Sequence, residues 1–237
     1  MTPASYRNCD VLGLALLSFA SGATDVLAFI KLGHLFTSAM TGNTALLAIA
    51  LGQGHVAAAG RSLTALLGFA LGVALATVVN ARRAQPSGPP TDPSRLLLLE
   101  LLFLVSCTAL WNASPEPIEG GVLYIVVLLS ALSMGIQAVA ARTVNVSGIS
   151  TIVFTAGVIR IVTAVTGAVA GPASSAASPP NMASELAAFL AYGCGALMVG
   201  VVTMQQVRLV VWIPVAAVIL ALAVWKIAGK REGRAAA

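Results

Sequence analysis

The chain has 237 residues, of which 58% are hydrophobic and 9% are charged, and its formal net charge is +5. Soluble globular domains carry about 25% charged residues, so this composition excludes that class and predicts a polytopic membrane protein. The cations stand singly or in pairs beside hydrophobic segments, which is typical of membrane topology signals and argues against a nucleic-acid partner.

Eight apolar segments follow one another along the chain, several of them near the roughly 20 residues that a spanning helix needs. They are residues 11–30, 36–52, 62–80, 95–112, 121–141, 148–170, 184–204 and 208–226. Polar residues interrupt the second and the sixth, which predicts broken or re-entrant helices there. We therefore predict one all-α membrane bundle with six spans and two broken or re-entrant segments; eight full spans are the alternative.

The distribution of basic residues favours six spans over eight. The loop at 81–95 carries three arginines and is predicted to be cytoplasmic. With six spans, Arg7, Arg142 and the basic tail at 226–234 fall on that same side, whereas eight spans place Arg7 and the tail outside. The sequence thus predicts a membrane protein with both termini in the cytoplasm.

Residues 36–44, Phe-Thr-Ser-Ala-Met-Thr-Gly-Asn-Thr, form a polar segment between apolar stretches. At bilayer depth such a sequence is tolerated where it is buried in protein or lines a wet cavity. Gly42 permits a turn, and Thr41, Asn43 or Thr44 can cap the start of a half-helix. The free N–H groups of that helix start suit a small polar or anionic solute, and packing with all polar groups satisfied internally is the alternative.

Three further polar side chains lie within apolar segments and are candidates for solute binding. Asp25 stands late in the first span, where a carboxylate is costly; it could instead lie at the interface and pair with Lys31. Arg160 is a cation inside the sixth segment, so we predict a pair between Asp25 and Arg160. Gln137 is more typical of a hydrogen bond between helices.

The order span, broken segment, span, span occurs twice, which predicts an inverted repeat with halves 1–114 and 115–237. Each half has an odd number of crossings in the six-span arrangement, so the second half begins on the opposite side of the membrane. Aligning Met40 and Thr41 with Phe154 and Thr155 brings the two broken segments together.

Two motifs carry a resemblance to a known family. Gly22-Ala23-Thr24-Asp25, then Lys31-Leu32-Gly33 and the polar segment, resembles the first half of the YoaK family of bacterial membrane proteins. Residues 135–142 with Thr151 to Gly157 are similar to its second half, but Thr155-Ala156-Gly157 departs from the fuller Thr-Gly element. The resemblance implies a multi-pass protein of the bacterial inner membrane and implies no reaction.

The remaining polar and small residues predict structural roles. Cys9, Cys107 and Cys194 are odd in number and widely spaced, so neither a disulfide framework nor a metal site is expected. Glu100 and Glu185 stand near span ends, which predicts interfacial positions. The small residues Gly22 and Gly193 are expected to let helices approach closely.

The function that these features predict is transport of a small solute, with binding residues Asp25, Thr41, Gly42, Asn43, Thr44, Gln137, Thr155 and Arg160. No cofactor and no enzymatic activity are expected, because the chain contains no phosphate-binding loop, metalloprotease motif or recognisable nucleophile with a base. A noncatalytic membrane scaffold or complex subunit is the alternative, although it does not explain why charge is kept at depth.

Overall fold

The computed structural model describes residues 3–81, 93–144, 162, 182–203 and 207–235. The regular structure in these ranges is helical: α1 (Pro3–Lys31), α2 (Met40–Gly52), α3 (Val56–Ala81), α4 (Ser94–Ala113), α5 (Gly120–Thr143), α7 (Met182–Val202), α8 (Val207–Val210) and α9 (Trp212–Ala235). The predicted all-α bundle is therefore confirmed.

Six stretches of the described residues are long and apolar enough to cross a membrane. They are Asn8–Lys31, Val56–Ala81, Ser94–Ala113, Gly120–Thr143, Ala183–Val202 and Arg208–Ala228. The apolar helix α2 has 13 residues, so it is about 20 Å long and shorter than the roughly 30 Å hydrocarbon core. These lengths agree with the six predicted spans, while the second predicted broken segment, 148–170, lies outside the described residues except for Val162.

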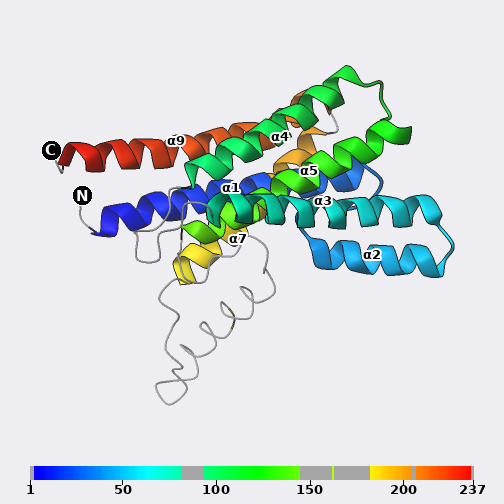
Figure 1. The fold of residues 1–237 in the computed structure, drawn as a ribbon, viewed down its shortest axis with the longest axis horizontal. Helices are drawn as coiled ribbons and strands as arrows, with labels where there is room; N and C mark the ends of the chain where they lie inside the picture. The colour runs from blue at the N-terminus through cyan, green and yellow to red at the C-terminus, as the bar shows by residue number, and fades with distance from the viewer. Residues whose placement is uncertain (1–2, 82–92, 145–161, 163–181, 204–206, 236–237) are drawn as a thin grey trace, which may run out of the picture.

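The helices form an elongated bundle in which the start of α1 and the end of α9 lie at the same end (Figure 1). The α2–α3 turn and the α4–α5 connection lie at the opposite end. Helix α1 packs mainly against α7 and α9, and α5 packs mainly against α3 and α4. The bundle core is thus built around the first and fourth of the spanning helices.

Glycines allow the closest helix crossings. A Cβ atom on Gly22 of α1 would collide with the Tyr192 carbonyl oxygen of α7, and one on Gly195 would collide with the Phe19 carbonyl oxygen. The predicted role of Gly22 is confirmed. The prediction for Gly193 was wrong, because a Cβ atom there would meet nothing within 4 Å and Gly195 lies at the crossing instead.

A matching crossing joins α3 and α5. A Cβ atom on Gly72 of α3 would collide with the Leu132 carbonyl oxygen, and one on Gly135 of α5 would collide with the Phe69 carbonyl oxygen. Small residues at such points let backbones approach closely, which is how helices pack when lipid supplies no hydrophobic contrast.

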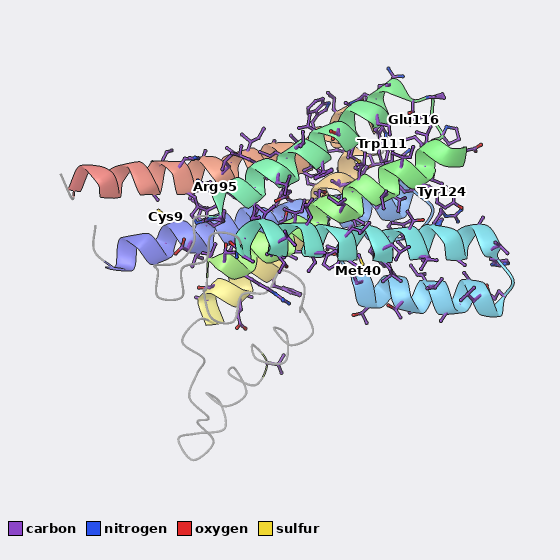
Figure 2. All side chains as sticks on the ribbon, viewed as in Figure 1. Cys9, Met40, Arg95, Trp111, Glu116 and Tyr124 are labelled. Atoms are coloured by element: carbon purple, nitrogen blue, oxygen red, sulfur yellow. The ribbon has the colours of Figure 1, made fainter. Side chains whose placement is uncertain are left out.

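The chain turns back into the bundle after α1. Gly33 and His34 have positive φ angles of +92° and +61°, and the His34 N–H donates to the Phe29 carbonyl at 3.1 Å. Glycine adopts this left-handed conformation without strain, so the α1 end can reverse direction within a few residues. Met40 then begins α2 within the length of the bundle, away from its end (Figure 2), and α2 runs beside α3 to the α2–α3 turn.

Candidate functional site

Asp25 of α1 has no solvent exposure and accepts five hydrogen bonds. Its Oδ1 accepts from the Thr37 N–H at 2.7 Å, the Thr37 hydroxyl at 3.0 Å and the Ser38 N–H at 2.7 Å. Its Oδ2 accepts from the Ser38 hydroxyl at 2.7 Å and the Tyr192 hydroxyl at 2.9 Å. We call these four residues the Asp25 cluster.

The polar segment supplies most of the Asp25 cluster because the reversal after α1 lays residues 36–39 back against that helix. Two of the donors are backbone N–H groups of adjacent residues, an arrangement that suits an anion. Here the anion is the protein's own carboxylate. These donors precede α2, so they are not the N–H groups of the helix start that the sequence predicted for a solute.

Asn43 fixes the shape of this turn from inside α2. Its side-chain nitrogen donates to the Phe36 carbonyl at 2.5 Å, and its side-chain oxygen accepts from the Phe36 N–H at 2.9 Å. The side chain is fully buried. Asn43 thus closes the polar segment on itself and supplies hydrogen-bond partners to both backbone groups of Phe36.

The predicted side-chain cap at the start of α2 is wrong. The N-cap residue is Ala39, and no side-chain oxygen caps the helix. Thr44 donates its hydroxyl to the Met40 carbonyl at 3.0 Å, and both Thr41 and Thr44 are exposed. The two threonines therefore differ from Asn43, which is buried and bound to Phe36.

Gly42 has a packing role in the turn. A Cβ atom at this position would approach the Phe36 ring to 3.0 Å, which is tight but not prohibitive. The Phe36 ring in turn stacks on the Phe29 ring at a centroid distance of 5.3 Å. The glycine leaves room for the aromatic side chain that covers the polar segment.

Gln137 is not a member of the Asp25 cluster. From α5 its side-chain nitrogen donates to the Leu17 carbonyl at 3.0 Å and to the Ser21 hydroxyl at 2.7 Å, so it links α5 to α1. This is the hydrogen bond between helices that its sequence context predicted. The structure therefore brings Asp25 and Asn43 together around the polar segment and leaves Gln137 separate from them.

The predicted cation partners of Asp25 are not seen among the described residues. Lys31 lines a hollow of about 450 Å³ with Trp111 and Glu116, and the bonds to Asp25 come from uncharged groups. Arg160 and Thr155 lie outside the described residues, so the predicted pair between Asp25 and Arg160 stays a prediction. Within the described ranges, no group of three or more His, Cys, Asp or Glu side chains could hold a metal ion.

Tyr192 is the member of the Asp25 cluster that the sequence analysis missed. It reaches Asp25 from 167 residues further along the chain, and the glycine crossing of α1 with α7 brings it there. The available signal was a tyrosine in an apolar span, because a buried phenol requires a hydrogen-bond partner. Nothing local identified that partner as Asp25.

Comparison with known proteins agrees with this architecture. The family described as "Protein of unknown function (DUF1275)" matches residues 13–224. The chain is 30% identical over 235 residues to the UPF0700 transmembrane protein YoaK of Bacillus subtilis (strain 168), an alignment that covers 98% of the chain and all of that relative. No solved structure matches the chain.

Proposed function

We propose that this multi-pass membrane protein, which belongs to the DUF1275 family, is a small-solute transporter or permease whose moving element is the turn around Asp25. The observation that carries the proposal is the re-entry of residues 36–39 into the bundle. There a buried carboxylate holds them to α1 and, through Tyr192, to α7. Irregular backbone beside a buried charge is characteristic of transport sites.

An inverted repeat with halves 1–114 and 115–237 is part of the proposal. In this repeat α1, α3 and α4 of the first half correspond to α5, α7 and α9 of the second. The packing of α1 against α7 and α9 then corresponds to the packing of α5 against α3 and α4, which is what the structure contains. The glycine contacts follow the same exchange. Gly22 meets the carbonyl three residues before Gly195, and Gly135 meets the carbonyl three residues before Gly72. In the reciprocal contacts, Gly195 meets the carbonyl three residues before Gly22, and Gly72 meets the carbonyl three residues before Gly135. This agreement supports a two-fold relation between the halves.

The two proposed halves differ at the polar centre. The exchange that pairs Gly22 with Gly135 and Gly195 with Gly72 matches Asp25 to Ala138 and Tyr192 to Phe69. The place related to the Asp25 cluster by this exchange therefore has no carboxylate, because Ala138 stands for Asp25, and no phenol, because Phe69 of the first half stands for Tyr192. In such a protein the Asp25 cluster would be the one polar gate, and the equivalent place in the repeat, with Ala138 and Phe69, would be an apolar gate.

The proposed solute is small and polar or anionic. In the observed state the carboxylate of Asp25 holds the N–H groups of Thr37 and Ser38. When the turn moves away from α1, those donors become free to bind a solute anion, which replaces Asp25 as their acceptor. Closing the gate restores the internal bonds and releases the solute, with no covalent step.

A noncatalytic scaffold is the second candidate, and one observation favours it. Each oxygen of Asp25 already has its donors, so the cluster meets the requirement of a purely structural site. The two functions differ in whether the cluster ever opens to water.

Thiol accessibility at Ser38 separates the two. Ser38 is 6% exposed, and Ser38→Cys keeps a small side chain that can still face Asp25. In a background lacking Cys9, Cys107 and Cys194, a membrane-impermeant maleimide is added to cells and to inverted vesicles. The control is Gln53→Cys, at an exposed position in the α2–α3 turn, which reacts from one side only.

A transporter predicts slow labelling at position 38, accelerated several-fold by the additional change Asp25→Asn, because that change weakens the closed state. If position 38 stays unlabelled from both sides in both backgrounds while the Gln53→Cys control reacts, the cluster is dry packing and the scaffold function replaces transport.

A further inference from the structure

Glu100 of α4 is fully buried, and neither of its carboxyl oxygens has a hydrogen-bond partner among the described residues. The sequence predicted an interfacial position for this side chain. Instead its neighbours one turn away on α4, Leu96, Leu97 and Leu104, belong to an apolar cluster shared with α1, α5 and α9. Glu100 thus differs from Asp25, which has five donors.

Two other unpartnered oxygens lie on the helices around Glu100. They are the Ser18 hydroxyl of α1 and the side-chain oxygen of Gln137 on α5, both at least 99% buried. The bond from Gln137 to Leu17 puts these two residues at the same level of the bundle. The unpartnered atoms of Glu100, Ser18 and Gln137 are all oxygens that can accept a hydrogen bond. A proton is the smallest species that such acceptors can bind.

No described charged side chain neutralises Glu100. The other titratable and charged groups on α4 and on the three helices that share its apolar cluster are Tyr6, Arg7, Cys9, Asp10, Asp25 and Lys31 on α1, Arg95 and Cys107 on α4, Tyr124 and Arg142 on α5, and Lys226, Lys230, Arg231, Glu232 and Arg234 on α9. Asp10 binds the Trp225 indole N–H, and no hydrogen bond within the described residues reaches Glu100. An ionised carboxylate is strongly unfavourable in such a setting, so the group must bind a proton or a cation.

Two hollows lie between Glu100 and the α4–α5 end, and Glu100 itself lines neither of them. Leu104, one turn beyond Glu100, lines a cavity of about 20 Å³ together with Thr24, Thr108 and Trp111, enough for one water molecule. Trp111 also lines the larger hollow that contains Glu116, and Figure 2 shows both residues near the α4–α5 connection. Glu100, Leu104, Thr108 and Trp111 follow one another at helical spacing on one face of α4.

We propose that the Glu100 carboxyl group is a proton-binding site, and that its proton exchanges with water on the side of the bundle where the two hollows lie. Where the proposed transport function holds, on which this second role rests, Glu100 is the site that couples solute movement to a proton gradient. Glu100 takes up one proton as its carboxylate becomes a carboxylic acid, and it releases that proton when water reaches it.

Dicyclohexylcarbodiimide tests proton binding without any transport assay. This apolar reagent reacts with protonated carboxyl groups: the acid proton moves to a carbodiimide nitrogen, the carboxylate oxygen bonds to the central carbon, and the adduct rearranges to an N-acylurea. Mass spectrometry of peptides from the full-length protein is expected to find the adduct at Glu100. It is expected to be absent at Asp25, whose oxygens are occupied by five donors, and from the Glu100→Gln variant.

Absence of an adduct at Glu100 in the folded wild-type protein overturns the proposal. A second measurement is the melting temperature of Glu100→Gln, in which a neutral amide replaces a neutral acid of similar size. A decrease of more than about 5 °C, well beyond the change from a small loss of stability, indicates that the variant removed a needed charge and also overturns the proposal.

Uptake into reconstituted vesicles separates coupling from transport, with labelled lactate, glutamate and phosphate as probes. Acceleration by an imposed pH gradient in the wild type, and its loss in Glu100→Gln, supports coupling at this residue. An equal response in both proteins overturns coupling and leaves transport intact. If no probe enters, transport of these anions fails, and the carbodiimide adduct alone decides the proton site.

Discussion

At the level of single residues, the buried carboxylate of Asp25 is stabilised by uncharged groups. The sequence pointed to Lys31, Arg160 or a solute as its partner, since charges in a membrane usually pair with charges. Backbone N–H groups and hydroxyls supply the bonds instead, because the reversal at Gly33 and His34 brings residues 37 and 38 directly against α1. A carboxylate with several good donors does not require a cation.

We expect Asp25→Asn to destabilise the protein more than Ser38→Ala does. The asparagine amide turns a donor toward groups that also donate, and leaving two or more of them unpaired costs about 2 to 6 kcal/mol of unfolding free energy. Ser38→Ala removes one donor from an oxygen that keeps the Tyr192 bond, so it costs about 1 to 3 kcal/mol. Unfolding in mixed micelles with increasing dodecyl sulfate measures both. Equal losses would mean that the Asp25 charge contributes nothing beyond one hydrogen bond.

At the level of helices, the polar segment follows the pattern of a broken helix, but its details depend on packing. The sequence predicted that a threonine or asparagine side chain would cap the start of α2. The side chain of Asn43 instead binds Phe36, because both backbone groups of that residue are enclosed and need partners. A backbone requirement at Phe36 thus determined the role of a side chain seven residues further along the chain.

Two glycines on α7 provide a matched comparison of helix packing. Gly195→Ala is expected to reduce the thermal stability strongly, because its Cβ atom collides with the Phe19 carbonyl and α1 must move away from α7. Gly193→Ala adds a methyl group in open space and is expected to leave stability unchanged or to raise it by up to about 1 kcal/mol through helix propensity.

Melting temperatures of the two variants in the same detergent decide the point. If both variants lose stability equally, the effect does not come from a steric collision at the helix crossing, and the close approach of α1 to α7 does not hold in solution. The same comparison at Gly72 would test the equivalent contact between α3 and α5.

For the whole molecule, six spans place the start of α1 and the end of α9 at one end, with the α2–α3 turn at the other (Figure 1). The basic residues predict which side that end faces. Arg7, Arg95, Arg142 and Lys226 lie at or near helix ends on the side of the termini, and cytoplasmic loops are enriched in such residues.

We therefore expect both termini in the cytoplasm and the α2–α3 turn outside. A green fluorescent protein fused to the C-terminus of the full chain should fluoresce, since it matures on the cytoplasmic side, while alkaline phosphatase at the same point should be inactive. A thiol introduced by Gln53→Cys should react with an impermeant reagent in intact cells. A dark fluorescent fusion with an active phosphatase fusion would reverse the orientation.

Much of the architecture could be predicted because membrane insertion depends on local properties. Composition gave the class, and apolar runs of about 20 residues gave the spans to within several residues of the observed helices. The polar segment at 36–44 was recognised as the break because polar residues in an apolar stretch need a structural reason. The segment at 148–170 and the roles of Thr155 and Arg160 stay predictions.

What the sequence alone determined is the membrane class, the six spans found in the described part of the chain and the position of the first break, since each depends on the hydrophobicity and length of a local segment. Only the tertiary structure decided that Tyr192 joins Asp25, that Gly195 and not Gly193 lies at a crossing, and that Glu100 is enclosed without a partner. These features depend on how each helix is rotated about its axis and where it crosses its neighbours. Contacts between residues far apart in the chain set both, and no local pattern encodes them.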